Sequence, residues 1–363
     1  MRIAVDAMGG DHAPQEIVPG ALAAAQTIDT EICLVGDESR LNELLQRARD
    51  GTRNTVGRVT IRHSEGVVGM SETPRAALQR GRTSSMAECI EMVKQGEAQA
   101  AVSAGNSGAF MALATTRLRN IADISRPAIA ILIPTRTGRT VILDAGANAD
   151  CKPEHLLQFA TMGSCYAEHV LGLRRPRVAV LNIGEEVNKG NALVHATHPL
   201  LETAPVNFVG HIEGNAIHEG DVDVIVADGF VGNVVLKVFE GSVQFVVDTM
   251  RAGIAQSTFC RLGAWLMKPA FRYLRRRCDW AEYGGALLLG VNGVCVVGHG
   301  RSDRRAVCTA IQVAHDAVAH DIIEQMRRSV QQLSAVPRRA ELLSDGQPLS
   351  DNIGSACGPT ELL

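Results

Sequence analysis

The stretch "RIAVDAMGGDHAPQEIVPGALAAAQ", residues Arg2 to Gln26, joins a short apolar run, a glycine-rich turn and a longer segment with helical spacing. The pattern recurs at once, with "EICLVG" (31–36) followed by "DESRLNELLQRAR" (37–49). Strands that end at glycine or aspartate and lead into amphipathic helices are typical of βαβ units on a parallel sheet buried on both faces. We therefore expect a three-layer α/β/α fold with a mostly parallel, Rossmann-like sheet.

The same alternation extends along most of the chain. It predicts helices over Pro153–Val170 and Val231–Met250, and further strands over 58–63, 99–104, 127–134, 139–145, 176–184, 206–214, 222–229 and 293–299. The adjacent runs 127–134 and 139–145 are joined by "TRTG", which predicts a hairpin inserted into the sheet. We expect one catalytic domain over 1–333 and a poorly ordered tail over 334–363, where Pro, Gly and Ser dominate.

Composition excludes several classes of protein. Hydrophobic residues make up 46% and charged residues 21%, with a net charge of -3, so nothing global points to a nucleic-acid partner. The nine cysteines lack CxxC or Cys/His spacing, which argues against a zinc site or a disulfide scaffold and for a reducing cytosol. No apolar run approaches the ~20 residues that span a bilayer, so we expect a cytoplasmic protein that does not cross a membrane.

Glycine, asparagine and aspartate gather in six stretches that follow predicted strands: 6–14, 102–109, 143–150, 181–190, 227–237 and 283–293. Parallel sheets bind ligands beyond the carboxyl ends of their strands, and helix starts there attract anions. We expect the six stretches to form one shared anion site. Its candidate binding residues are Gly9, Gly10, Asn106, Gly108, Gly146, Asn148 and Gly232. Each loop taken alone is equally typical of simple turn chemistry.

Short motifs bear on two other enzyme classes. The chain lacks GxGxxG and GxxxxGK[ST], which weakens a cofactor-binding Rossmann oxidoreductase. "AVSAG" places Ser103 where the nucleophile of a strand-to-helix elbow would lie, and Asp228 and His299 follow in the order of an α/β-hydrolase triad. A serine thioesterase or acyltransferase is therefore the alternative function, against a buried serine at the end of a strand.

Seven of these motifs together resemble one family: "DAMGGD" (6–11), "VSAGNSGA" (102–109), "LDAGAN" (143–148), "LNIGEE" (181–186), "DGFVGNVVLK" (228–237), "YGGALLLGVNG" (283–293) and "HG" (299–300). In this order, from Met1 to about Ser329, they are similar to the acyl-carrier-protein:phosphate acyltransferases, the PlsX family. Departures are Ser107 in place of the usual Thr, Ala145 in place of a larger apolar residue, and "HGRSD" after the last strand.

The resemblance implies that inorganic phosphate attacks the thioester of a long-chain acyl group on acyl carrier protein. The acyl phosphate product then passes to a membrane glycerol-3-phosphate acyltransferase (PlsY) for phospholipid synthesis. The resemblance also implies a homodimer, no cofactor, no metal, and a fold akin to phosphotransacetylase and the isocitrate/isopropylmalate dehydrogenases. A binding module that scaffolds a membrane acyltransferase is the non-enzymatic alternative.

Phosphate is already an anion, so such an enzyme has only to hold it beside the thioester and stabilise the oxyanion. Lys189 and Asn233 are the catalytic candidates, a cation at a strand end and an amide expected to open the next helix. His12 and His299 are candidate proton donors. Loop support is expected of Asp6, Asp11, Asp144 and Asp228, with a metal site as their alternative. A covalent acyl-cysteine route would have Cys151 nearest to these loops.

Between Ala252 and Cys278 the chain has no acidic residue, whereas it has six Lys or Arg and several large apolar side chains. Two amphipathic helices interrupted near Pro269 are expected, as a hairpin over 252–280. Contact residues would include Trp265, Leu266, Phe271, Arg272, Arg275 and Arg276. The hairpin fits an anionic membrane, the acidic surface of acyl carrier protein or a second subunit, and fits nucleic acid least.

Overall fold

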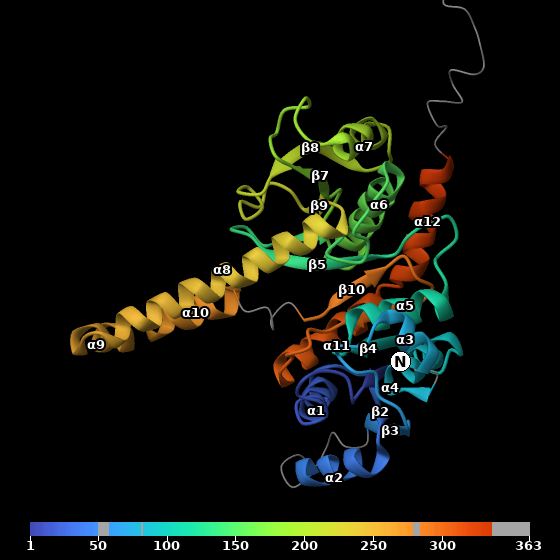
Figure 1. Ribbon diagram of the computed structural model, residues 1–363, viewed down its shortest axis with the longest axis vertical. Helices are drawn as coiled ribbons and strands as arrows, with labels where there is room; N and C mark the ends of the chain where they lie inside the picture. The colour runs from blue at the N-terminus through green and yellow to red at the C-terminus, as the bar shows by residue number, and fades with distance from the viewer. Residues whose placement is uncertain (50–57, 81–82, 279–283, 336–363) are drawn as a thin grey trace, which may run out of the picture.

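The computed structural model describes residues 1–49, 58–80, 83–278 and 284–335 (Figure 1). Its strands form one 11-stranded sheet in the order β3-β2-β1-β4-β11-β10-β5-β6-β9-β7-β8. The strands are β1 (Arg2–Asp6), β2 (Glu31–Gly36), β3 (Val59–His63), β4 (Ala100–Ser103), β5 (Ala128–Pro134), β6 (Arg139–Leu143), β7 (Arg177–Asn182), β8 (Asn207–Glu213), β9 (Val224–Val226), β10 (Ala286–Leu289) and β11 (Val294–Val297).

Strand direction reverses near the middle of the sheet. β10 is antiparallel to both β11 and β5, and β5 is antiparallel to β6, which confirms the expected hairpin. The strands on either side are parallel among themselves. Consequently β1, β4 and β11 end at one edge of the sheet, here called the β1 edge, while β6, β9 and β7 end at the opposite one, the β6 edge. The expectation that all six loops share one edge is therefore wrong.

The reversal involves residues 283–293, whose glycines predict a loop after a strand. Four of them, Ala286–Leu289, form strand β10. A run of four apolar residues between glycines is too short to show a period, and only long-range pairing with β5 and β11 makes it a strand.

The helices cover both faces of the sheet, which gives the expected three layers (Figure 1). Ile3 and Val5 face one core with α1, α6 and α11, whereas Ala4 between them faces a second core with α4 and α5. The helices are α1 (Ile17–Thr27), α2 (Glu38–Arg49), α3 (Pro74–Arg80), α4 (Ser85–Lys94), α5 (Ser107–Leu118), α6 (Pro153–His169), α7 (Ala192–Glu202), α8 (Gly229–Ala255), α9 (Thr258–Leu266), α10 (Lys268–Cys278), α11 (Arg304–Ala319) and α12 (Ile322–Ala335).

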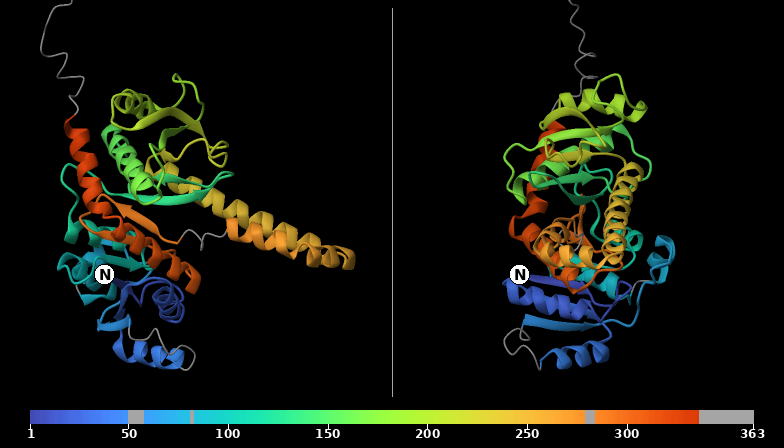
Figure 2. Two further views of the ribbon diagram at one scale, coloured as in Figure 1. Left: turned by 180° about the vertical axis from the view of Figure 1, so that it is seen from behind. Right: turned by 90° about the vertical axis from the view of Figure 1, so that its left-hand side faces the viewer.

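Helices α8, α9 and α10 form an arm that projects from the body, with α10 returning beside α8 (Figure 2). The two expected amphipathic helices are present, and they separate at Met267, two residues before Pro269. The expected helix over 231–250 is longer than predicted, so α8 itself is the outgoing leg. Ser334 and Ala335 close α12, whereas the rest of the predicted tail, 336–363, and the hairpin end, 279–280, lie outside the described residues.

By length and composition alone α8 would suffice to cross a membrane, with a mean hydropathy of 1.4 over its most apolar window and 6% of that window buried. Its first turn, however, is fixed in the body: Gly229 and Gly232 are buried in the helix start. Helix α8 is therefore anchored in the body at its start and continues into the arm.

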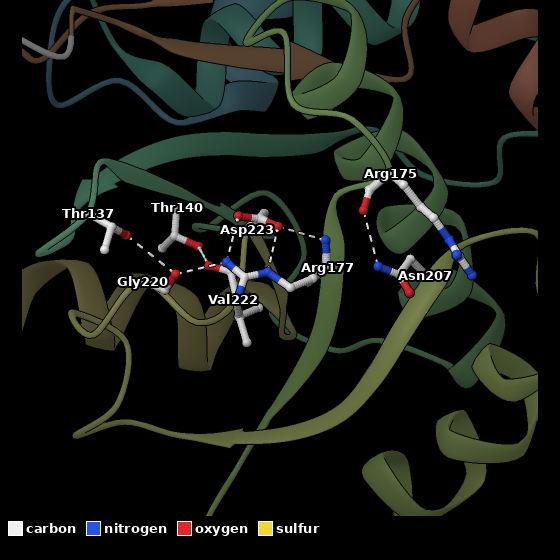
Figure 3. Close-up of polar contacts among 8 residues, drawn as sticks. All are labelled: Thr137, Thr140, Arg175, Arg177, Asn207, Gly220, Val222 and Asp223. Atoms are coloured by element: carbon white, nitrogen blue, oxygen red, sulfur yellow. Dashed lines mark hydrogen bonds and ion pairs between the residues drawn. The ribbon is translucent and has the colours of Figure 1, made fainter.

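Polar contacts close the amino ends of the outer strands (Figure 3). Arg177 at the start of β7 donates from Nε to Asp223 Oδ2 at 3.0 Å and from Nη2 to the Gly220 carbonyl at 2.8 Å. Thr140 in β6 donates to the Val222 carbonyl at 2.6 Å. This network fixes the segment before β9. The loops at the β6 edge lie at the other ends of these strands and have contacts of their own.

Candidate functional site

The β1 edge is organised around the carboxylate of Asp6, which is 1% exposed. It accepts hydrogen bonds from the hydroxyls of Ser85 (2.6 Å) and Ser103 (2.7 Å) and from the Met8 amide (3.2 Å). Burial raises the pKa of Asp6, and the two hydroxyl hydrogen bonds oppose that shift. The carboxylate thus points into its own loop rather than toward a ligand, which fits the supporting role expected of it.

Ser103 does not belong to a catalytic triad. Its hydroxyl is 1% exposed, donates to Asp6 and accepts from the Gly105 amide at 3.1 Å. Asp228 lies at the β6 edge, where it caps α8. Because the three proposed members are not brought together, the serine-hydrolase alternative lacks its geometry.

Asn106 caps α5, with Oδ1 accepting from the Ala109 amide at 3.0 Å. Its Nδ2 donates to the carbonyls of Met70 (2.9 Å) and Glu72 (2.8 Å). The predicted phosphate ligand is therefore an anchor that ties residues 69–72 over the start of α5. A capping amide and a ligand-binding amide look alike in sequence, and these contacts support the capping role.

The start of α5 nevertheless offers donors to an anion. The amides of Ser107 and Gly108, the first two helical residues, have no intrahelical acceptor. The glycine turn after β1 lies beside them, since a Cβ added at Gly105 would come within 3.4 Å of the Gly9 Cα. Gly10, with a φ of +110°, adopts a backbone conformation that favours glycine. Two candidate glycines, Gly9 and Gly10, thus adjoin a helix start with open amides.

The third loop of the β1 edge follows β11. The Gly300 carbonyl accepts from the Asp11 amide at 2.8 Å, which joins this loop to the exposed residue His12 and its neighbours. His299 is half-buried, and burial lowers its pKa. Two residues of α8 also act on this pKa: the charge of Glu240 raises it, and the charge of Lys237 lowers it. Its Nδ1 accepts from the Arg301 amide at 3.1 Å, so the neutral ring carries its hydrogen on Nε2.

The β6 edge repeats the design around Asp144, which is fully buried. The carboxylate accepts from the amides of Ile129 (3.0 Å), Gly146 (3.2 Å), Ala147 (3.0 Å) and Asn148 (2.7 Å). Burial raises the pKa of Asp144, and these hydrogen bonds oppose the shift. The Asn148 side chain donates to Asp144 (2.9 Å) and to the Pro127 carbonyl (2.8 Å). Both amide hydrogens are thus taken by Asp144 and by the carbonyl of Pro127, just before β5, so this geometry does not support the predicted contact with phosphate.

Helix α8 begins directly on this loop. Asp228 accepts from the Val231 amide at 2.9 Å, and the Gly229 amide donates to the Asn148 carbonyl at 2.8 Å. A Cβ at Gly232 would lie 1.9 Å from the Asp144 carbonyl oxygen, so only glycine allows the helix this close. Asn233 does not open the helix as predicted; it lies one turn inside and packs against Gly146.

Helix α8 connects the two edges. Its start packs on the Asp144 loop, and Lys237, about 12 Å further along at 1.5 Å per residue, acts on His299 at the β1 edge. Asn233, Lys237 and Glu240 recur at helical spacing and so share one side of α8. The structure therefore brings candidate residues of both edges to a single helix, although not into one loop cluster.

Lys189 lies apart from the β1 edge. It is exposed in the loop after β7, where its amide donates to the Glu186 carbonyl at 3.0 Å and its carbonyl accepts from Asn182 Nδ2 at 3.0 Å. A hollow of about 700 Å³ beside this loop is lined by Glu185, Glu186, Glu213 and Glu219. Four carboxylates make it unsuitable for phosphate.

The acyl-cysteine alternative also loses support. The Cys151 thiol donates to the Asn148 carbonyl at 3.6 Å, and burial raises its pKa to about 11, so it is a poor nucleophile near neutral pH. Within the described ranges, no group of three or more His, Cys, Asp and Glu side chains is arranged to hold a metal ion.

The expected contact residues of the arm lie on its outer helices, α9 and α10. Trp265 and Leu266 are each 66% exposed, and Phe259 is 85% exposed. Phe271 is partly buried and Arg272 is exposed. Arg275 and Arg276 belong to α10, but their side chains fall outside the described part of the chain.

Comparison with known proteins settles the family. The model of the family described as "Fatty acid synthesis protein" matches residues 1–325. The chain belongs to this family. It is 47% identical to a phosphate acyltransferase from Desulfitobacterium hafniense over 92% of this chain and 99% of that protein. It is 48% identical to a phosphate acyltransferase from Pelotomaculum thermopropionicum over 92% and 96%. The protein is accordingly an acyltransferase of fatty acid and phospholipid synthesis.

Solved structures confirm the fold class. A phosphotransacetylase from Streptococcus pyogenes superimposes with a TM-score of 0.58 at 16% identity, over 89% of this chain and 94% of that one. A 4-hydroxythreonine-4-phosphate dehydrogenase from Klebsiella pneumoniae gives 0.53 at 13% identity, over 87% and 99%. At such low identity these likenesses concern the fold alone.

Proposed function

We propose that this enzyme transfers a long-chain acyl group from the thioester of acyl carrier protein to inorganic phosphate. A phosphate oxygen bonds to the thioester carbonyl carbon, and the carbon–sulfur bond then breaks. The products are acyl phosphate and a thiolate that takes up a proton. The reaction is reversible, because a phosphate anhydride and a thioester are both activated acyl groups.

One observation carries the proposal: the start of α5 presents the amides of Ser107 and Gly108, while the neighbouring carboxylate of Asp6 is turned inward. Backbone amides at a helix start favour a phosphate dianion, and an internalised carboxylate does not repel it. Neutral His299, with a hydrogen on Nε2, is suited to donate to an oxyanion or to the departing sulfur. His12 is a second candidate donor in the same loop cluster.

The first three turns of α8 lead from the β6 edge toward this site, and we assign the thioester end of the substrate to them. Asn233 faces the Gly146 turn and is the candidate amide donor to the thioester carbonyl. Lys189 stays a catalytic candidate only at the β6 edge, where the thioester would bind, because its loop follows β7 and β7 is next to β9 in the sheet.

The decisive assay incubates the pure protein with palmitoyl carrier protein, with and without inorganic phosphate, and follows the products by mass spectrometry. We expect acyl phosphate only when phosphate is present, and no acylated side chain. Release of free fatty acid without phosphate, or a stable ester on the protein, would contradict direct attack by phosphate.

The arm supplies the proposed link to the membrane. Its tip is apolar, and α9 and α10 carry only basic charges between 252 and 278. We propose that the enzyme is a cytoplasmic homodimer, that this tip rests on the anionic inner face of the membrane, and that acyl phosphate is delivered there to the glycerol-3-phosphate acyltransferase. Trp265→Ser should reduce cosedimentation with anionic vesicles without changing turnover of a soluble substrate. Undiminished vesicle binding would contradict the membrane contact, and the arm would then bind a second subunit or acyl carrier protein.

A further inference from the structure

A chain of polar side chains lies beneath the loop that carries Lys189. Asn182, the last residue of β7, donates from Nδ2 to the carbonyls of Gly184 (2.9 Å) and Lys189 (3.0 Å), which are near the two ends of the loop. The same amide nitrogen lies 3.2 Å from Nδ1 of His211 on β8. Both hydrogens of this amide are used on the two carbonyls, so one amide holds the loop from below and packs against an imidazole.

His211 in turn meets a second imidazole. Its Nε2 lies 3.1 Å from Nδ1 of His198 on α7, with the rings edge to face and their centroids 4.9 Å apart. The other nitrogen of His198, Nε2, lies 3.4 Å from Glu202 Oε1. The order Glu202, His198, His211, Asn182 thus joins a surface carboxylate to the loop through four side chains.

This chain accepts one proton but not two. In the neutral pair His198 Nδ1–H donates to His211 Nε2, and His211 carries its own hydrogen on Nδ1, toward the backbone of Glu186. One added proton therefore goes to His198 Nε2, beside Glu202. A second added proton would set two N–H groups against each other at 3.1 Å. The rings would then have to separate, and His211 would move away from Asn182 and from the backbone of Glu186 in the loop.

Resting on the proposed role of Lys189, we propose that His198 and His211 are positioning residues: they hold the Lys189 loop when at most one ring is protonated and release it when both are.

The surroundings of the pair favour this behaviour. Titratable or charged groups that face it are His195 and Glu202 on α7, Glu213 on β8, Glu186 and Lys189 in the loop, and Arg175 before β7, which lines the same hollow as His198. Burial lowers the pKa of His211, His198 lowers it further, and a backbone hydrogen bond with Glu186 opposes them. A histidine whose pKa is lowered in the folded state contributes stability above its ordinary value of 6.5 and loses it as the pH falls below that value.

The test follows hydrogen–deuterium exchange of residues 183–190 in the full-length enzyme at about pH 7.5 and about pH 5.5. Rates are corrected with an unstructured peptide of the same sequence. The wild type should lose protection about tenfold on acidification. His211→Asn keeps a polar group beside Asn182 but cannot titrate, so its protection should not change with pH. His320→Asn, an exposed histidine at the end of α11, is the matched control and should behave as the wild type.

Equal protection of the wild-type loop at both pH values would overturn the proposal, as would an unchanged pH response in His211→Asn. The pH profile of kcat/KM for phosphate gives a second reading: its acid limb should move to lower pH in His211→Asn. Lys189→Ala separates the two proposals. If it turns over normally, the catalytic role of Lys189 fails, while the exchange measurement still decides whether the histidine pair holds the loop.

Discussion

The two aspartate-centred loops, "DAMGGD" at the β1 edge and "LDAGAN" at the β6 edge, have similar sequences and opposite outcomes. Both bury a carboxylate at the end of a strand. At Asp6 two serine hydroxyls satisfy much of that carboxylate, and the start of α5 keeps open amides. At Asp144 the donors are backbone amides and Asn148, and the start of α8 is closed by Asn148 and Asp228. One loop therefore leaves amides open at a helix start, whereas the other forms a packing joint with the start of α8.

The joint should be the least tolerant part of the molecule. Gly232→Ala would place a methyl group 1.9 Å from the Asp144 carbonyl oxygen, so we expect a loss of more than about 4 kcal/mol of unfolding free energy, or no soluble protein. Gly241→Ala on the same helix is the control: nothing lies within 4 Å, and it should stabilise by up to about 1 kcal/mol. Chemical denaturation measures both. A Gly232→Ala enzyme as stable as the wild type would show that α8 does not pack this closely.

Replacing the buried carboxylate should also destabilise the β6 edge more than the β1 edge. Asp144→Asn turns an amide toward backbone donors that cannot reverse their role, and should cost about 3 kcal/mol. Asp6→Asn faces Ser85 and Ser103, whose hydroxyls can rotate to accept, and should cost about 1 kcal/mol. Denaturant midpoints of the two variants give the order directly. The reverse order would mean that hydroxyl donors are as fixed as amide donors.

The open amides can be tested without disturbing the packing. Ser107→Pro removes one N–H at the first position of α5, where proline is tolerated, and the preceding residue Asn106 already has an extended conformation with ψ 110°. We expect KM for phosphate to rise about tenfold, equivalent to about 1.4 kcal/mol, with stability nearly unchanged. Steady-state kinetics with varied phosphate provide the measurement. An unchanged KM in a folded variant would remove α5 from the phosphate site.

Ser103→Ala should have the smallest effect. Among the residues that the structure describes, the hydroxyl bonds to Asp6 and the Gly105 amide, so we expect about 1 kcal/mol of lost stability and turnover within about threefold of the wild type. Turnover and thermal unfolding are measured on the same preparation. Near-total loss of activity in a stable variant would restore the serine-nucleophile reading.

Local patterns in the sequence predicted most of the fold. Apolar runs such as 31–36 and 139–143 were identified as strands because burial on both faces leaves a continuous apolar signature. The reversal at β10 was missed because it depends on which distant strands pair with Ala286–Leu289. The roles of the side-chain amides were missed for a related reason. Asn106, Asn148 and Asn233 have the same chemical group, and only their neighbours in space show that Asn106 caps α5, Asn148 supports the Asp144 loop and Asn233 packs against Gly146.

The central claim is that phosphate binds at the start of α5 and not at the start of α8. A structure of the enzyme soaked with inorganic phosphate tests it most directly. We predict a phosphate within hydrogen-bonding distance of the Ser107 and Gly108 amides and of His299 Nε2. A phosphate seated instead on Phe230 at the start of α8, or beside Lys189 with the α5 amides unoccupied, would contradict the account.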